Sequence, residues 1–175
     1  MSRRKLLRGA LGAIGLVLAG KGAARAASGG DAVGSPAIKP LDLPHESWKK
    51  LVSPEAYEVL FEEGTERPRS SPFDTEKRAG TYVCAACFLP LFASTAKFDS
   101  GTGWPSFFQP IEGHVGTERD FKLLLPRTEY HCARCGGHQG HVFDDGPPPT
   151  GLRYCNNGVA LRFVPEGETL PALRP

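Results

Sequence analysis

The sequence predicts a mainly β fold with an antiparallel core and a helix at one side. Short β-prone runs follow one another from residue 81 to residue 164, and the loops between them are rich in Gly, Pro, Asp and Ser. These loops have the length of hairpin connections, and no internal repeat is visible. The expected strands are 81–84, 121–125, 129–132, 141–143, 152–155 and 159–164.

One helix is expected before these strands. Ser53 has the side chain of an N-cap, Pro54 suits the first helical position, and Gly64 is expected to end the helix. Its apolar face is formed by Tyr57, Leu60 and Phe61. We expect this face to pack against the sheet.

We expect one domain, preceded by an export signal and followed by a short tail. Residues 1–26 have a basic start with Arg3 and Arg4, a weakly apolar stretch and a small-residue end, and they resemble a twin-arginine signal peptide. The apolar stretch is too short to be a full membrane span, and we expect no stable membrane insertion after the signal is cleaved. Residues 27–40 are expected to be a flexible tether, 41–166 the domain and 167–175 a C-terminal tail. The expected location is periplasmic or otherwise exported, and an ordinary secretory signal is the alternative.

The charge of the domain argues against nucleic acid as a partner. The chain has 21 basic and 19 acidic residues, a formal net charge of +2. Six of the basic residues lie in residues 1–26, which contain no acidic residue. The rest of the chain therefore has 15 basic and 19 acidic residues, a formal net charge of −4. A mildly acidic domain disfavours binding through phosphate contacts.

Four of the five cysteines form two C-x-x-C pairs. Cys84 and Cys87 are the first pair, and Cys132 and Cys135 are the second, with 44 residues between the inner cysteines. Four thiolates so arranged can bind one tetrahedral Zn²⁺ ion. Exported proteins often form disulfides instead, so a disulfide within each pair is the alternative. We expect one structural zinc ion per chain.

The fifth cysteine, Cys155, is unpaired. It belongs to residues 130–163, which hold three of the five cysteines and three of the five histidines. Arg153 and Asn157 lie two residues from it, and His138 and His141 precede it, an arrangement that can favour a thiolate. A buried, inert cysteine is the alternative.

A long series of motifs resembles one known family. Residues 132–157 read C-x-x-C-G-x-H-x-G-H-V-F-x-D-G-P-x-P-T-G-L-R-Y-C-x-N, and GTERP at 64–68, GTYVCAAC at 80–87 and KFDSGTGWPSF at 97–107 precede them. In this order they resemble the B-type methionine sulfoxide reductases, which reduce the R epimer of methionine sulfoxide. The resemblance covers roughly residues 48–164. It implies two antiparallel sheets in a tent-like arrangement with peripheral short helices and a structural zinc clip on the side away from the catalytic cysteine.

The resemblance also implies roles for residues of this chain. Cys155 would attack the sulfoxide sulfur and become a sulfenic acid, and His141 would give a proton to the sulfoxide oxygen. Trp104, in a glycine-rich loop, would hold the methyl group of the substrate, and Phe143 is expected beside it, with a core position as its alternative. The remaining catalytic candidates, which would position and polarise the reacting groups, are His138, Asn157, Asp145 and Arg153.

Regeneration is expected to need an external thiol. Many relatives carry a second cysteine in the loop 100–104, where this chain has Thr102, which cannot form a disulfide. The resemblance therefore implies a thioredoxin-like or small-thiol reductant, with oxidised protein or peptide methionine as substrate.

Other uses of these residues stay open at this point. His138, His141 and Asp145 could form a second metal site. A zinc-ribbon binding module would need only the four paired cysteines. A zinc-dependent enzyme of the related tent-like fold could instead act on a thiol adduct, such as that of glutathione and formaldehyde.

Overall fold

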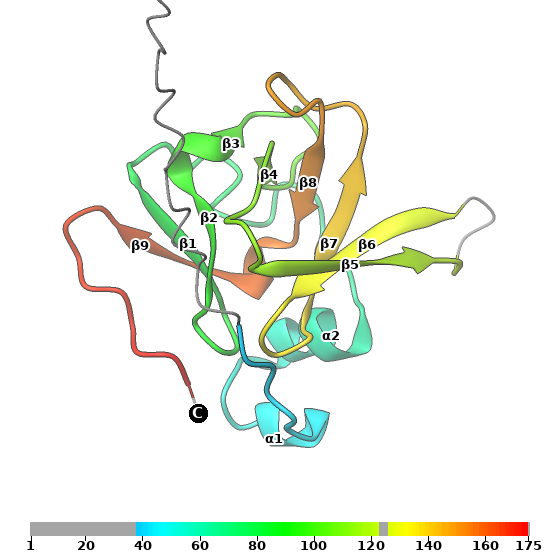
Figure 1. Cartoon of the computed structure of the whole chain (residues 1–175), viewed down its shortest axis with the longest axis vertical. Coiled ribbons are helices and arrows are strands. Elements are labelled where there is room, and N and C mark those ends of the chain that lie inside the picture. The colour runs from blue at the N-terminus through cyan, green and yellow to red at the C-terminus, as the bar shows by residue number, and fades with distance from the viewer. Residues whose placement is uncertain (1–37, 123–125, 175) are drawn as a thin grey trace, which may run out of the picture. The chain divides into compact units, whose positions relative to one another are not determined.

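Two antiparallel β-sheets form the folded part of the chain (Figure 1). The computed structural model describes residues 38–122 and 126–174, so the expected signal peptide, most of the tether and residues 123–125 of an expected strand lie outside it. The helices are α1 (His45–Trp48) and α2 (Pro54–Glu62), with 3-10 turns η1 (Ser94–Ala96) and η2 (Gly158–Ala160). The strands are β1 (Gly80–Cys84), β2 (Pro90–Ala93), β3 (Lys97–Phe98), β4 (Ser106–Phe107), β5 (Val115–Asp120), β6 (Arg127–Cys132), β7 (His138–Phe143), β8 (Arg153–Asn156) and β9 (Leu161–Pro165). The predicted mainly β architecture with two antiparallel sheets is confirmed.

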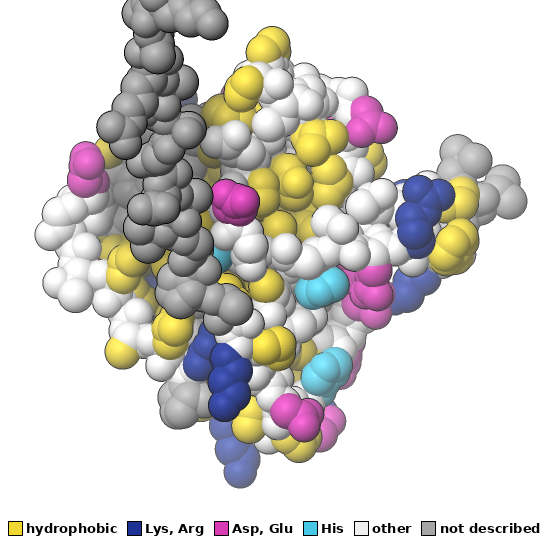
Figure 2. All heavy atoms as spheres, in the orientation of Figure 1, with side chains coloured by type: hydrophobic (Ala, Val, Ile, Leu, Met, Phe, Trp, Pro, Cys, Tyr) yellow, Lys and Arg dark blue, Asp and Glu magenta, His cyan; other side chains and the backbone are white. Residues whose placement is uncertain are grey.

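The smaller sheet has the order β2-β1-β9 and the larger has the order β3-β4-β8-β7-β6-β5. Every strand pair within them is antiparallel. Both helices lie at one end of this arrangement, and the β5–β6 hairpin projects to one side (Figure 1). Charged side chains of both signs gather around the outer part of that hairpin (Figure 2).

Aromatic side chains fill the space between the two sheets. Phe92 of β2 stacks on Phe107 of β4 with 4.1 Å between ring centroids, and Tyr82 of β1 meets the same ring edge-on at 5.0 Å. Tyr130 of β6 and Tyr154 of β8 complete the cluster. Such rings bury a large apolar area and favour these stacked and edge-to-face arrangements. This inner layer is the main hydrophobic core.

The alternation of side chains along each strand places the functional residues on the two faces of the larger sheet. Tyr154 points inward to the core, so its neighbour Cys155 points to the outer face. On β6, Tyr130 is inward and Cys132, two residues on, is on the same inner side. The cysteine pair of β6 and the unpaired Cys155 therefore belong to opposite faces of one sheet.

Helix α2 forms largely as its local sequence predicts. The hydroxyl oxygen of Ser53 accepts a hydrogen bond from the Ala56 N–H at 3.2 Å, and Pro54 is the first helical residue. The predicted apolar face, Tyr57, Leu60 and Phe61, is buried. The helix ends one residue earlier than expected, because Glu63 rather than Gly64 takes the left-handed conformation, at φ 54°.

Helix α1 was not predicted. It is a single turn, too short to show a helical period in the sequence. Its Trp48 is buried and stacks on Phe61 of α2 with 5.5 Å between ring centroids. The contact fixes the start of the domain onto α2.

The strand expected at 121–125 is wrong for its first two residues, and the strand before it was missed. β5 ends at Asp120, and Phe121, just after it, is 71% exposed. β5 is the edge strand of its sheet and presents mostly polar, exposed residues, so it lacks the apolar alternation that marks a half-buried strand. Phe121 and Lys122 follow the strand instead of forming it.

Among residues 38–122 and 126–174, no helix has both the length and the apolar character required to span a bilayer.

Candidate functional site

A pocket of about 150 Å³ opens beside Cys155 on the outer face of the larger sheet. Its walls include five residues that the sequence singled out: Cys155, His141, Asn157, Trp104 and Phe143. Unpredicted residues of the wall are Thr65, Arg127, Gly140 and Asn156. The pocket thus joins a thiol, an imidazole and two aromatic rings from separate parts of the chain.

Strand register places Cys155 beside His141. The two residues are direct cross-strand partners on β8 and β7, so their side chains emerge from the same face. Gly140, which precedes His141, has no room for a side chain, because a Cβ atom there would lie 1.9 Å from the carbonyl oxygen of Cys155. Close approach of these two strands therefore requires glycine.

A β-bulge in β7 brings the second histidine to that same face. Between β6 and β7 the partners change from Tyr130 and Gly140 to His131 and His138, which leaves Gln139 unpaired. Strict alternation would put His138 and His141, three residues apart, on opposite faces. With the bulge their rings lie 5.4 Å apart.

The surroundings of Cys155 act on its thiol in opposite directions. Burial raises the pKa of the Cys155 thiol, while the charge of Arg153 and hydrogen bonds from Thr102 and Arg153 lower it. Burial prevails, so the pKa of Cys155 is raised, whereas the thiolate expected from the sequence would require a lowered pKa. The free site therefore favours the protonated thiol.

His141 is held by a carboxylate that the sequence did not identify. His141 Nε2 lies 2.8 Å from Asp120 Oδ2, and Arg127 Nη2 lies 2.6 Å from the same oxygen. The backbone N–H of Lys122, followed by His141 and Arg127, holds the pKa of Asp120 well below its usual range. Because an ionised carboxylate only accepts hydrogen bonds, Nε2 carries the proton. Burial lowers the pKa of His141, and the hydrogen bond to Asp120 opposes that shift.

His138 lies behind His141 and does not line the pocket. Its Nδ1 is 2.6 Å from Glu129 Oε1, and both side chains are buried. Burial lowers the pKa of His138 to about 4 and raises the pKa of Glu129. His138 is therefore a neutral donor that satisfies a buried carboxyl group.

Asp145 and Arg153 form a bidentate ion pair at the edge of the pocket. Arg153 Nε donates to Asp145 Oδ1 at 2.7 Å, and Nη2 donates to Oδ2 at 2.9 Å. The guanidinium also lies over the ring of Phe143, 4.3 Å from its centroid. Arg153 is thereby fixed next to Cys155, and Phe143 is a wall of the pocket rather than a core residue.

Trp104 is fixed by the segment that carries Glu66. The indole Nε1 donates to the carbonyl oxygen of Glu66 at 3.2 Å. The carboxylate of Glu66 accepts from the backbone N–H groups of Gly158 at 2.5 Å and Val159 at 3.0 Å, and its own N–H donates to Asn157 Oδ1 at 3.0 Å. Trp104 is thus tied to the loop that follows Cys155, although 51 residues separate them in sequence.

The second metal site considered from the sequence does not form among the described residues. His138 is paired with Glu129, His141 with Asp120, and Asp145 with Arg153. Within residues 38–122 and 126–174, one group of metal-ligating side chains converges on a common point, and it consists of the four paired cysteines.

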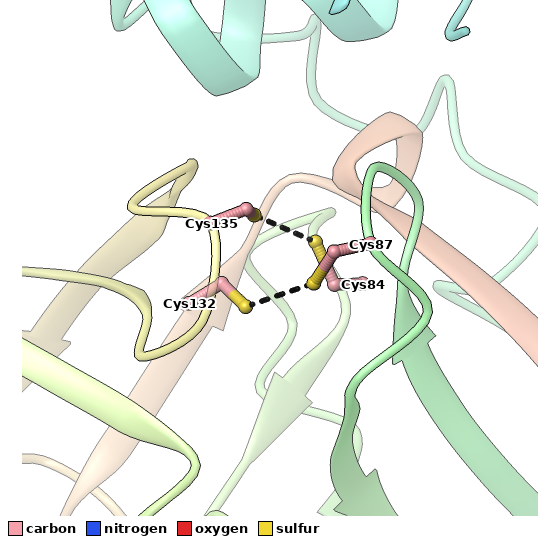
Figure 3. Close-up of side chains that lie close together, drawn as sticks. All are labelled: Cys84, Cys87, Cys132 and Cys135. Atoms are coloured by element: carbon pink, nitrogen blue, oxygen red, sulfur yellow. Dashed lines mark hydrogen bonds between the residues drawn. The ribbon is translucent and has the colours of Figure 1, made fainter. Parts of the chain in front are cut away.

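The four sulfurs of this cysteine cluster, Cys84, Cys87, Cys132 and Cys135, lie within 4.8 Å of one another and are buried (Figure 3). Cys84 Sγ is 3.6 Å from Cys135 Sγ, and Cys87 Sγ is 3.5 Å from Cys132 Sγ. Sulfurs at the corners of a zinc tetrahedron with bonds of about 2.3 Å are about 3.8 Å apart, whereas a disulfide bond measures about 2.05 Å. The donor set and its spacing fit a tetrahedral metal ion. All five cysteines are free thiols, and the two close contacts join one pair to the other.

The cysteine cluster also connects the two sheets. Cys84 ends β1 of the smaller sheet and Cys132 ends β6 of the larger, and each is followed by a tight turn with the second cysteine of its pair. None of the four lines the pocket at Cys155. A metal ion here would hold the sheets together and would not touch a substrate in that pocket.

Comparison with known proteins agrees with this site. A model of the SelR domain matches residues 52–165. The chain belongs to this family, the B-type methionine sulfoxide reductases. It is 54% identical over 129 residues to the peptide methionine sulfoxide reductase MsrB of Pseudomonas putida, covering 73% of this chain and 97% of that protein. The MsrB of Bradyrhizobium diazoefficiens is 57% identical over 122 residues, which cover 69% and 88% of the two chains. That of Methanosarcina barkeri is 50% identical over 133 residues, which cover 75% and 94%.

In this B-type reductase family member, sequence reasoning missed the residues that hold the predicted ones. Asp120, Glu129 and Glu66 each accept a hydrogen bond from a residue of the site that lies on another segment: His141, His138 and Trp104, respectively. One signal was available for Glu129, because it is a carboxylate at the start of the strand expected at 129–132, next to Tyr130. Glu66 lies in the GTERP motif at 64–68, which was noted without a role for the glutamate. For Asp120 the sequence contains no comparable signal, because it lies in a polar stretch like many others.

Proposed function

We propose that this protein reduces the R epimer of methionine sulfoxide, in peptides or proteins, by thiol chemistry at Cys155. The observation that carries the proposal is the shared pocket, in which the Cys155 thiol lies beside His141 and faces aromatic walls. A sulfoxide needs a nucleophile at its sulfur and a proton at its oxygen, and an apolar wall can hold its methyl group. Family membership supports the same reaction.

The protonation states of Cys155 and His141 in the free enzyme determine how the first step begins. Burial favours the neutral thiol of Cys155 and the neutral ring of His141, whose proton is on Nε2 facing Asp120. The free lone pair of His141 is then on Nδ1. It takes the thiol proton as Cys155 Sγ attacks the sulfoxide sulfur, and the imidazolium passes that proton to the sulfoxide oxygen. Asp120 stabilises the imidazolium in between.

The step is balanced without any other reactant. A sulfur–sulfur bond first forms between Cys155 and the sulfoxide sulfur. The protonated oxygen then moves to Cys155 as both the sulfur–oxygen bond of the substrate and the new sulfur–sulfur bond break. Methionine leaves and Cys155 becomes a sulfenic acid. The substrate sulfur is reduced by two electrons and Cys155 is oxidised by two.

Selection of one epimer follows from the opposed walls of the pocket. Trp104 and Phe143 offer apolar surface, while His141 and Asn157 offer polar groups. A chiral sulfoxide fits only if its methyl group meets the first wall and its oxygen meets the second. The mirror-image sulfoxide would place oxygen against an indole and leave the polar groups unpaired.

Zinc is the ion that we propose for the cysteine cluster. Four thiolates in a closed set are typical of structural Zn²⁺ and leave no position for a substrate. When bound, the ion supplies cross-linking of the two sheets and no step of the reaction. The zinc-ribbon alternative gives no role to the pocket, and the thiol-adduct alternative requires an open metal position, which a closed set of four thiolates does not offer.

An external thiol is proposed to regenerate the enzyme. Thr102, at the position where many relatives carry a second cysteine, lies close enough to Cys155 for its hydroxyl to lower the pKa of the thiol. The four remaining cysteines are buried in the cluster on the inner side of the sheet. A small thiol or a thioredoxin-like protein would form a mixed disulfide with Cys155 and release water, and a second thiol would then restore the cysteine.

An epimer-resolved assay tests this function. Free and peptide-bound methionine sulfoxide, as separate R and S epimers, are incubated with the protein and dithiothreitol, and methionine is quantified. We expect turnover of R alone, and loss of turnover in Cys155→Ser with zinc content unchanged. Turnover of S, or activity that survives Cys155→Ser, would contradict the proposal.

We further propose export through the twin-arginine route, which carries folded proteins and so suits a domain that acquires zinc first. The support is the basic start with Arg3 and Arg4, which lies outside the described residues. Replacing both by Lys should leave precursor in the cytoplasm of a host that has this route. Export that persists and depends on the general secretory machinery would overturn this proposal.

A further inference from the structure

Behind Cys155, on the inner face of the larger sheet, a chain of buried polar groups runs from the cysteine cluster to the residue that follows Cys155. Gln139 Nε2 donates to Cys84 Sγ at 3.6 Å, and Gln139 Oε1 accepts from Asn156 Nδ2 at 3.4 Å. Asn156 Oδ1 in turn accepts from the hydroxyl of Tyr130 at 2.6 Å. Gln139, Asn156, Tyr130 and Cys84 are each 0% exposed. The proposed reaction does not use this chain, although Asn156 also forms part of the pocket wall.

Gln139 can join the two sites because it is the bulged residue of β7. Having no partner on β6, its backbone carbonyl is free of that ladder and accepts from both the N–H and the side-chain amide of Asn157, at 2.8 and 3.1 Å. Its backbone thus holds Asn157, and its side chain holds Asn156 and reaches Cys84. The two residues that follow the nucleophile are therefore both fixed on the residue that contacts the cluster.

A carboxamide is a rigid link between these two ends. Its N–H and C=O groups lie in one plane, so a bond from the amide to sulfur sets the direction in which the oxygen accepts from Asn156. Inside a protein, with no water to replace a lost partner, each bond of such a chain constrains the next. A change at Cys84 must then be absorbed by Gln139, Asn156 or both.

We propose that Gln139 is a positioning residue that couples the metal ion in the cysteine cluster to the conformation of Cys155. Its N–H group stabilises the metal-bound sulfur of Cys84, and its oxygen orients Asn156 and with it the peptide unit after the nucleophile. This rests on the proposed zinc and on the proposed role of Cys155. By reciprocity, a variant that breaks the chain loosens the metal and alters Cys155 together.

Two readouts other than sulfoxide turnover test the coupling. In the zinc-loaded full chain, transfer of zinc to a chromophoric chelator measures how firmly the metal is held. Carboxamidomethylation of Cys155 by iodoacetamide, quantified by peptide mass spectrometry, measures its accessibility and reactivity. Gln139→Leu keeps a side chain of similar size and removes both hydrogen bonds, and Gln109→Leu on the exposed surface is the matched control.

We expect Gln139→Leu to release zinc about tenfold faster, the usual scale for loss of a partner that supports a metal ligand. Its Cys155 should also be alkylated at a changed rate, with Gln109→Leu like wild type. Zinc release equal to wild type would overturn the proposal. Faster release with unchanged alkylation would restrict Gln139 to the metal and overturn the coupling.

A second measurement needs no variant and so does not depend on whether Gln139→Leu folds. Cd²⁺ forms longer bonds to sulfur than Zn²⁺ and shifts Cys84 without changing the chain. Exchange of the metal should change the alkylation rate of Cys155 by about twofold or more in wild type, and by less in Gln139→Leu. An unchanged rate in wild type would overturn the coupling. A wild-type chain that binds no zinc would instead contradict the proposed metal, and inactivity towards sulfoxides with the coupling intact would contradict the proposed reaction.

Discussion

His141 Nε2 lies 2.8 Å from Asp120 Oδ2, so the imidazole beside the nucleophile is oriented by a carboxylate from the edge strand of the sheet. Asp120 is the last residue of β5, and it reaches past β6 to His141 on β7. Arg127, at the start of β6, fixes the same carboxylate oxygen. The far end of the sheet thus determines which ring nitrogen of His141 is free for chemistry.

The first prediction concerns Asp120→Asn. An amide keeps the shape but no longer stabilises an imidazolium, so we expect kcat for methionine R-sulfoxide to fall about ten- to a hundredfold. Because Asp120 raises the pKa of His141, its loss should move the acidic limb of the kcat/KM profile to lower pH. Asp42→Asn, at an exposed site, is the control. An unchanged profile would show that Asp120 does not act through His141.

The second prediction concerns the metal. Cys84→Ser should remove zinc binding, whose apparent free energy in structural sites is roughly 10 to 16 kcal/mol, comparable with the stability of a whole domain. We expect loss of the cooperative unfolding transition in circular dichroism and loss of activity as a consequence. Cys155→Ser is the matched control and should keep one zinc ion and the fold. A folded, active and zinc-free Cys84→Ser protein would refute the structural role.

The third prediction concerns regeneration. A single turnover with methionine R-sulfoxide and no reductant should leave a sulfenic acid on Cys155 that a dimedone probe traps, with zinc retained. Thr102→Cys places a thiol where a hydroxyl now contacts Cys155, so this variant should form an internal disulfide and escape the probe. Thr117→Cys, on the exposed edge strand β5, is the control and should still be trapped. A rapid internal disulfide with zinc release in the wild type would identify a cysteine of the cluster as the reductant instead.

The fourth prediction concerns stability and pH. Burial lowers the pKa of His138 from 6.5 to about 4 in the folded protein, so between these values the unfolded chain binds a proton that the folded one does not. This contribution to stability is present above pH 6.5 and is lost as the pH falls towards 4, by roughly 3 kcal/mol at most. Urea unfolding of His138→Gln between pH 7 and pH 5, with zinc content checked, should show a shallower pH dependence than wild type. His45→Gln, at an exposed histidine, should behave as wild type.

Elements with a local cause were largely predictable. Ser53 and Pro54 start α2 through contacts within one turn. The two C-x-x-C pairs predicted the cysteine cluster, because metal ligands need fixed spacing. The strands β1, β6, β7, β8 and β9 could be located by their β-prone residues, whereas the short strands β2, β3 and β4 were not predicted. The edge strand β5 could not, because its pairing comes from β6 and not from any apolar alternation of its own.

The sequence by itself determined the family, the mainly antiparallel β fold and the set of cysteines that meet at one point, because these depend on residue types at short, fixed spacings. Tertiary structure decided what surrounds them. The bulge at Gln139 places His138 and His141 on one face, and the register of β5 brings Asp120 to His141 from 21 residues away. Burial, which sums over all the packed elements, reversed the expected direction of the Cys155 pKa. Register, bulges and burial are properties of the paired strands together, and no single stretch of sequence contains them.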